Sequence, residues 1–144
     1  MTDDDHSFQA SATIAAPPAA VWKVLTDVAA WPTWDSGVES VVGTAALGGK
    51  LTIRSLVAPG RAFPVKVTAF DSPTRLEFTG GMPLGLFRGV RSYTLTPDGT
   101  GTRFVMREVY TGALLGAMWK QIPDLTPSFA TFVDGLKAKV ESGA

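Results

Sequence analysis

The chain has 144 residues, enough for one domain with its own hydrophobic core. Its 13 basic and 13 acidic residues balance, and no basic excess gathers in one stretch, which argues against nucleic acid as a partner. Cysteine is absent and histidine occurs once, so disulfides and the usual metal sites are excluded, and we expect no metal and no cofactor.

The beginning of the chain is polar and acidic, and it lacks the apolar stretch of a secretory signal. No run of about 18 apolar residues occurs, so we predict no transmembrane segment and a cytoplasmic location. We expect residues 1–7 to form a flexible tail and residues 8–144 to form a single domain.

The segment that follows the tail predicts a strand and two short helices. Residues 8–15 alternate weakly between apolar and polar side chains, and Pro17 ends this strand because proline cannot donate to a ladder. Proline suits the first turn of a helix, so Pro18 can begin one. The next apolar residues recur at helical spacing: Val21, Val24, Leu25 and Val28. A break at Trp31 and Pro32 starts another helical turn.

Between residues 38 and 110 the apolar period changes to two, which predicts six consecutive antiparallel strands. The strands are expected at residues 38–45, 51–57, 63–69, 76–78, 87–95 and 103–110. Glycine and proline turns separate them, and the turn at residues 97–101 is a strong hairpin signal. The apolar segment Met82–Phe87 is either a mobile gate or an ordinary surface loop, and the sequence leaves both interpretations open.

After Gly112 the apolar period becomes helical and continues almost to the end of the chain. Pro123 and Pro127 interrupt it, because each removes a hydrogen bond from a helix interior. We expect a kinked or two-piece helix, with Thr126 capping the final piece. The predicted fold is α+β: a curved antiparallel sheet of about seven strands, in the order β-α-α-β6-α, wrapped on a long C-terminal helix.

This order of elements resembles the START-like, helix-grip superfamily (SRPBCC), which includes polyketide cyclase/dehydrase-like, CoxG-like and plant pollen-allergen-like proteins. Three motifs carry the resemblance: Ile14-x-Ala16-Pro17-x-x-x-Val21-Trp22-x-x-Leu25-Thr26-Asp27, then Trp31-Pro32-x-Trp34, and residues 107–112 at the end of the last strand. The resemblance covers residues 8–141. It implies a START-like domain with a deep apolar cavity between the curled sheet and the C-terminal helix. Members bind lipids, steroids, polyketides, quinones or hormones, and a minority are cyclases.

The last hairpin makes the sharpest local prediction. With its tip at residues 99–100, Tyr93 faces Met106 and Arg91 faces Glu108. The apolar pair points this face inward, so Arg91 and Glu108 are predicted to form an ion pair on the cavity side. Such a pair is either purely structural or a polar anchor for a ligand in an apolar pocket.

The predicted ligand-contacting residues combine this pair with large apolar side chains of the expected inner surface. They are Trp31, Trp34, Phe63, Phe78, Arg91, Tyr93, Met106, Glu108, Met118, Trp119 and Phe129. For the aromatic members, simple core packing is a competing interpretation. Catalysis would fall to Arg91, Tyr93 or Glu108, with Asp35 and Glu39 as further acid–base candidates.

The leading hypothesis is a non-enzymatic protein that binds or carries a small hydrophobic ligand, such as a lipid, a quinone, or a polyketide-like or aromatic molecule. Two alternatives stay open, a cyclase or aromatase acting on polyketide-like substrates and a protein-interaction module. No Ser-His-Asp arrangement is indicated, because the single histidine, His6, lies in the expected tail. The sequence gives no indication of the oligomeric state.

Overall fold

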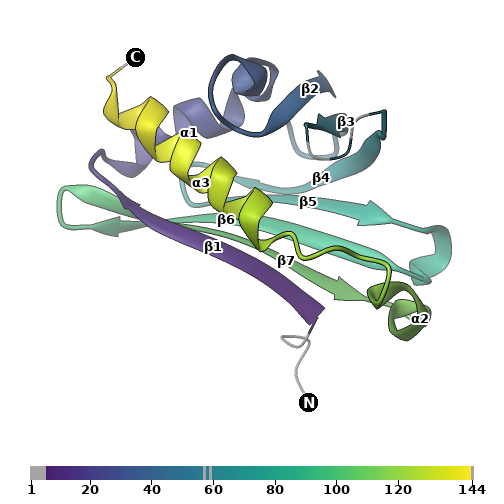
Figure 1. Ribbon diagram of the computed structural model, residues 1–144. Coiled ribbons are helices and arrows are strands. Elements are labelled where there is room, and N and C mark those ends of the chain that lie inside the picture. Colours follow the sequence, from purple (N-terminus) through teal and green to yellow (C-terminus); the bar gives the residue numbers. More distant parts are fainter. Residues whose placement is uncertain (1–5, 57, 59, 144) are drawn as a thin grey trace.

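The α+β architecture predicted from the sequence is confirmed by the computed structural model, which describes residues 6–56, 58 and 60–143 (Figure 1). The strands are β1 (Ser7–Ile14), β2 (Val38–Gly43), β3 (Lys50–Ser55), β4 (Phe63–Asp71), β5 (Arg75–Gly81), β6 (Arg88–Asp98) and β7 (Gly101–Thr111). The helices are α1 (Pro18–Thr26), α2 (Leu115–Trp119) and α3 (Thr126–Glu141), with short 3₁₀ turns η2 (Val28–Thr33) and η3 (Pro83–Gly85).

The start of the chain differs from the expectation of a tail over residues 1–7. β1 already begins at Ser7, and the ring centre of His6 lies 4.9 Å from that of Trp119 in α2. Pairing of β1 with β7 extends the ladder this far, with Ser7 opposite Val109. Residues 1–5 of the expected tail lie outside the described residues, as does Val57 of the expected third strand.

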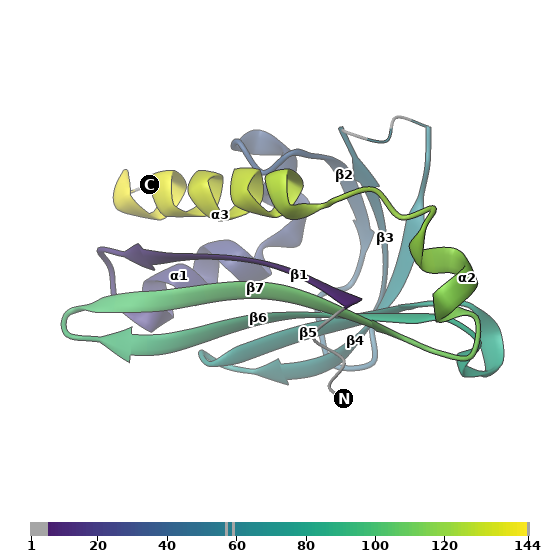
Figure 2. The same cartoon turned by 60° about the horizontal axis from the view of Figure 1, so that its bottom comes forward.

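The seven strands form one antiparallel sheet in the order β1-β7-β6-β5-β4-β3-β2, so β1 closes one edge by pairing with the last strand. Register shifts interrupt β4 between Val67 and Ala69 and β2 between Val38 and Ser40. Such irregularities bend a strand and increase its twist. Figure 2 shows the result: β2, β3 and the first part of β4 rise steeply from the plane of β5, β6 and β7. The sheet therefore has a concave inner face.

The first helix forms where the sequence predicted it, because Pro18 stands in the first turn and needs no hydrogen-bond donor there. Its buried residues are Val21, Trp22 and Leu25. η2 follows at once and buries Trp31, whose indole N–H donates to the Leu25 carbonyl at 2.9 Å. α1 and η2 thus cover one end of the concave face.

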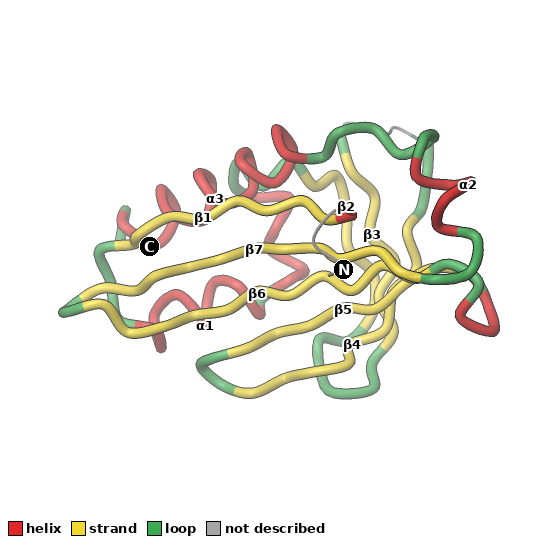
Figure 3. Tube along the Cα trace, turned by 90° about the horizontal axis from the view of Figure 1, so that it is seen from below, coloured by secondary structure: helices red, strands yellow, loops and turns green. Residues whose placement is uncertain are grey.

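The C-terminal helix is in two pieces, as the two prolines predicted. α2 ends at Trp119 and α3 begins at Thr126, with Pro127 in its first turn. The predicted cap is wrong: Thr126 makes no side-chain capping bond, and its N–H instead donates to the Asp124 carboxylate at 2.9 Å. α3 lies along β1 on the inner side of the sheet, and α2 lies apart from it beyond the end of β7 (Figure 3).

Candidate functional site

The structure pairs Arg91 of β6 with Glu108 of β7, as the hairpin register predicted. Nε of Arg91 lies 2.5 Å from Oε1 of Glu108, and the two side chains are 27% and 13% exposed. Tyr93, two residues after Arg91, and Met106, two residues before Glu108, share this face and are buried, so the pair lies on the inner face. Burial disfavours the charged guanidinium, but attraction to Glu108 outweighs it and raises the pKa of Arg91.

Two neighbours hold the ion pair in position. From α3, the Phe129 ring faces the guanidinium, with 4.8 Å between Cζ of Arg91 and the ring centre, which is a cation–π contact. On β6, Gly89 leaves the space that the Glu108 carboxylate occupies. A Cβ atom at position 89 would come within 2.9 Å of Oε2 of Glu108. A larger residue at this position would therefore displace the carboxylate.

The hydroxyl of Tyr93 lies buried at the same place. It makes no hydrogen bond of ordinary geometry with a described residue, and the neighbouring Arg91 guanidinium is close enough for a weak hydrogen-bonding interaction. Burial raises the pKa of Tyr93 to about 12, although Arg91 acts in the opposite direction. At neutral pH the hydroxyl therefore keeps its proton and remains a free hydrogen-bond donor.

Tyr110 belongs to the site although the sequence analysis did not select it. It follows Glu108 on the inner face of β7 and is 5% exposed. Burial, and then the nearby Glu108 carboxylate, raise its pKa far above the usual value. The rings of Phe8 and Trp119 lie 5.9 and 5.7 Å from it and cover this end of the interior. The alternation that placed Glu108 inward also applies to Tyr110 and would have identified it.

Sequence comparison places the chain in a known family. Residues 5–141 match the family described as "Polyketide cyclase / dehydrase and lipid transport". The chain belongs to this family. The match covers every element from β1 to α3, so the polyketide cyclase/lipid transport family includes the whole of the described fold. No curated protein matches the sequence significantly.

Solved structures share the fold of this family member at low sequence identity. TTHA0849 from Thermus thermophilus is 24% identical with a TM-score of 0.71, over 96% of this chain and 99% of that one. MLL2253 from Mesorhizobium loti is 18% identical with a TM-score of 0.73, again over 96% and 99%. DynU16, described as a putative protein in the dynemicin biosynthetic locus, is 21% identical with a TM-score of 0.69 over 96% of this chain and 48% of DynU16. Identities this low establish the fold alone.

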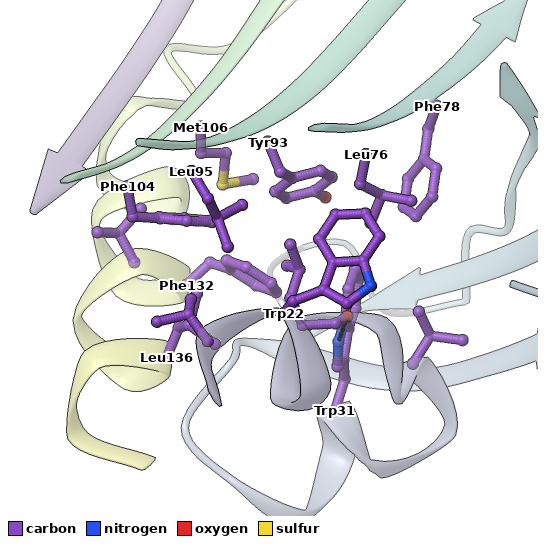
Figure 4. Packing of buried hydrophobic residues seen from close by; sticks show 14 of the residues in the cluster. Trp22, Trp31, Leu76, Phe78, Tyr93, Leu95, Phe104, Met106, Phe132 and Leu136 are labelled. Atoms are coloured by element: carbon purple, nitrogen blue, oxygen red, sulfur yellow. Dashed lines mark hydrogen bonds between the residues drawn. The ribbon is translucent and has the colours of Figure 1, made fainter. Parts of the chain in front are cut away.

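Aromatic side chains of the described residues occupy the space between the sheet and α3, where the resemblance implied a deep apolar cavity. Figure 4 shows Trp31, Phe78, Tyr93, Phe104 and Phe132 converging there from the sheet and the helices. The ring centre of Phe132 lies 4.8 Å from that of Trp31 and 5.7 Å from that of Tyr93. Two hollows of the described residues, of about 520 and 300 Å³, lie elsewhere and are open to solvent. Large aromatic side chains fill the space.

The remaining predicted contact residues divide into three groups. Phe78, Met106 and Phe129 are buried beside the ion pair, on neighbouring strands or on α3. Met118 and Trp119 lie on α2 and are partly exposed. The structure places the other three, Trp31, Trp34 and Phe63, away from the ion pair.

Those three residues have other surroundings. Trp31 is part of the core, and Trp34 packs against Phe132, with its indole nitrogen buried and not hydrogen-bonded to any described residue. Phe63 begins β4, is 39% exposed and faces Arg61, so the structure places it at the surface and away from the ion pair.

Two of the acid–base candidates also lie elsewhere in this family member. Asp35 is exposed in the loop after η2, and Glu39 is exposed on β2 at the far edge of the sheet. Among the described residues, no three His, Asp or Glu side chains gather in a way that could hold a metal ion. No helix of the described chain combines the length and apolar character needed to cross a membrane.

Proposed function

We propose that this protein binds a small, mostly apolar molecule whose carbonyl and hydroxyl groups meet the Arg91–Glu108 pair. The observation that carries the proposal is an inward-facing ion pair beside a buried tyrosine hydroxyl that makes no hydrogen bond of ordinary geometry with a described residue. Buried polar groups are normally satisfied within a protein, and an unsatisfied one needs an explanation. A ligand oxygen accepting from Tyr93 supplies it. The family description, which covers cyclases and lipid transport, supports the class of ligand.

The charges of the site favour an uncharged polar group on the ligand. Arg91 and Glu108 neutralise each other, so a carboxylate or an ammonium group on the ligand would meet one like charge. Arg91 uses Nε on Glu108, which leaves its terminal nitrogens as donors. Glu108 also interacts with the Tyr110 hydroxyl, but a carboxylate has lone pairs for a further donor from the ligand. A carbonyl next to a hydroxyl matches this pattern, as in hydroxyquinones and many polyketides.

The ligand reaches the pair from the end covered by α2. This helix buries none of its residues, and Trp119 reaches inward to stack on Phe8, with 5.3 Å between the ring centres. The opposite end is closed by α1 and η2, which pack tightly into the core. Because the interior is filled, binding requires the α2 segment and its aromatic neighbours to move aside.

The experiment uses alizarin, an aromatic molecule with a carbonyl beside a hydroxyl, at a mildly acidic pH that keeps its hydroxyls protonated and the ligand uncharged, and anthraquinone, which lacks the hydroxyls. We expect the protein to bind alizarin more tightly, and Arg91→Ala to weaken alizarin binding at least about tenfold, the loss of one charge-assisted hydrogen bond. Arg75→Ala is the matched control, because Arg75 forms a similar pair with Glu77 at 2.6 Å away from this site. Calorimetric titration and circular dichroism measure affinity and folding.

A second variant keeps the test valid if Arg91→Ala does not fold. Replacing both partners, Arg91→Met with Glu108→Leu, removes the charges at similar volume, a change that folded proteins usually tolerate. The preference for alizarin over anthraquinone should then disappear. Unchanged alizarin affinity in either folded variant, or equal weakening by Arg75→Ala, would contradict the proposal. Chemical conversion of a polyketide-like ligand would favour the cyclase alternative, and a stoichiometric protein recovered by pull-down would favour the interaction module.

A further inference from the structure

One end of the molecule exposes large apolar side chains. It is formed by residues 82–88 and 112–122, which lie together because the Leu114 N–H donates to the Leu86 carbonyl at 2.8 Å (Figure 1). Leu84 is 95% exposed, more than any other large apolar side chain of the described residues. The other large apolar side chains exposed here are Met82, Leu86 and Leu114, and we call these three residues and Leu84 the apolar tip.

The backbone of the loop holds Leu84 outward in a strained conformation. Its φ is +62°, a left-handed value that residues with a Cβ rarely adopt, between Pro83 and Gly85. This conformation costs on the order of 1 kcal/mol. A leucine exposed to this extent gains almost no burial within the described part of the protein. An apolar partner outside the chain would supply the missing contact.

The charges around the apolar tip have one sign. Residues 82–88 and 112–122 contain no aspartate or glutamate, and their two cations, Arg88 and Lys120, are exposed. Beside the tip, a hollow of about 520 Å³ on the sheet is lined by Met82, Arg88, Lys50 and Lys66. None of the four cations forms an ion pair with a residue that the structure describes.

The hollow contains a repulsive contact that an anion would relieve. Lys50 and Lys66 are direct partners in the β3–β4 ladder, and like charges opposite each other are destabilising. Glu77 lies near this hollow, where it accepts from the lining residue Thr68 at 2.7 Å, but Arg75 already binds its carboxylate. The hollow therefore keeps a net positive charge.

We propose that the apolar tip and this cationic hollow dock on an anionic phospholipid surface. The four tip residues enter the boundary between headgroups and acyl chains, while the cations at the hollow and Lys120 meet lipid phosphates. Met82 belongs to both regions, so apolar and cationic surfaces are continuous. The inference rests on these surface residues alone and holds whether or not the interior binds a ligand.

The test is co-sedimentation of the purified protein with vesicles of phosphatidylcholine, with and without phosphatidylglycerol. We expect binding to the mixed vesicles, and we expect it to weaken as salt is added. Leu84→Ser should lower the partition coefficient about tenfold, from the loss of one inserted leucine. Lys50→Gln with Lys66→Gln should lower it further, about fivefold for each charge removed.

Leu56→Ser is the matched control, because Leu56 is 60% exposed in the turn after β3, where its N–H donates to the Gly37 carbonyl, away from the tip and the hollow. It should leave the partition coefficient unchanged. The proposal is overturned if the mixed vesicles do not bind the protein, or if neutral vesicles bind it equally well. An equal loss in Leu56→Ser would also overturn it. Binding of free inorganic phosphate that depends on Lys50 and Lys66, without any vesicle binding, would show an anion site and no docking surface.

Discussion

The Tyr93 hydroxyl is an unsatisfied polar group within an otherwise apolar core. The side chain is fully buried, and its ring packs against Phe78 and Phe132 at 5.5 and 5.7 Å between centres. The ring therefore stabilises the fold, while the unpaired hydroxyl loses its hydration without gaining a hydrogen bond. If packing were the only role of this residue, phenylalanine at position 93 would give a more stable protein. The hydroxyl is explained if it acts in binding.

Tyr93→Phe should consequently stabilise the free protein while weakening its binding of alizarin. Removal of the unsatisfied hydroxyl is expected to raise the free energy of unfolding by about 1 kcal/mol. Urea denaturation at neutral pH measures the gain, and calorimetry measures the affinity. A variant that is destabilised by a similar amount would show that the hydroxyl already has a partner in the folded protein.

The same variant has a distinct alkaline signature. The pKa of Tyr93 is raised from 10.0 to about 12 in the folded protein, so the unfolded chain releases this proton first as the pH rises. The folded state then binds more protons than the unfolded state, and the free energy of unfolding falls between pH 10 and about 12. In Tyr93→Phe this contribution is absent, so its stability should fall less steeply over that range. If the free energy of unfolding falls equally with pH in both proteins over this range, the raised pKa of Tyr93 is contradicted.

Residue-level prediction from the sequence succeeded where strand alternation decides the outcome. The inward direction of Arg91, Tyr93 and Glu108 follows from the hairpin register, which a short turn fixes. Phe63 also lies in a predicted strand, but burial at a strand end depends on how far the sheet bends there. That bend arises from tertiary packing and the shifts in β2 and β4, which alternation does not reveal.

At the scale of elements, the approach of α3 to the loop after η2 closes one end of the interior. Gly135 makes this approach possible, because a Cβ atom there would overlap the carbonyl oxygen of Asp35. The neighbouring helix residues Phe132 and Leu136 are buried by the same contact between helix and core. A helical glycine normally weakens a helix, so its presence here is explained by close packing.

Gly135→Ala should therefore destabilise the protein by at least about 2 kcal/mol, since the backbone of one element has to shift. Gly116→Ala in α2 is the matched control, because no atom lies within 4 Å of the Cβ it would add. Alanine is the better helix former, so this control should be neutral or more stable by about 0.5 kcal/mol. Chemical denaturation of the two variants compares them directly, and similar stabilities would contradict the packing argument.

The elements were the most predictable level of this structure, because their signals are local. Prolines set the start of α1 and divide the C-terminal helix, and the change of apolar period marks the six strands. Helix caps were less predictable. Thr126 was expected to cap α3 with its side chain, but its backbone N–H instead donates to the Asp124 carboxylate. The choice between two neighbouring polar residues depends on a loop conformation that the sequence pattern does not determine.

At the scale of the whole molecule, the two ends differ in how firmly they are closed. α1, η2 and α3 close one end with fully buried residues such as Leu25 and Leu136, while α2 covers the other without burying any residue of its own. The lightly covered end also holds the apolar tip, so the proposed docking surface and the proposed entrance coincide (Figure 2). The filled interior was not predictable, because composition supplies aromatic residues without showing whether they line a cavity or fill it.

Trp119→Ala tests whether the lightly covered end is the entrance. Trp119 packs on Phe8 and Tyr110 above the ion pair, so its removal should raise the association rate of alizarin several-fold in stopped-flow absorbance. The cost in stability should stay near 1 kcal/mol, the value of a partly exposed aromatic contact. Trp34→Ala removes a partly exposed tryptophan that packs on Phe132, away from α2, and should leave the association rate unchanged. If Trp34→Ala accelerates binding and Trp119→Ala does not, the ligand enters between η2 and α3, and α2 is not the cover.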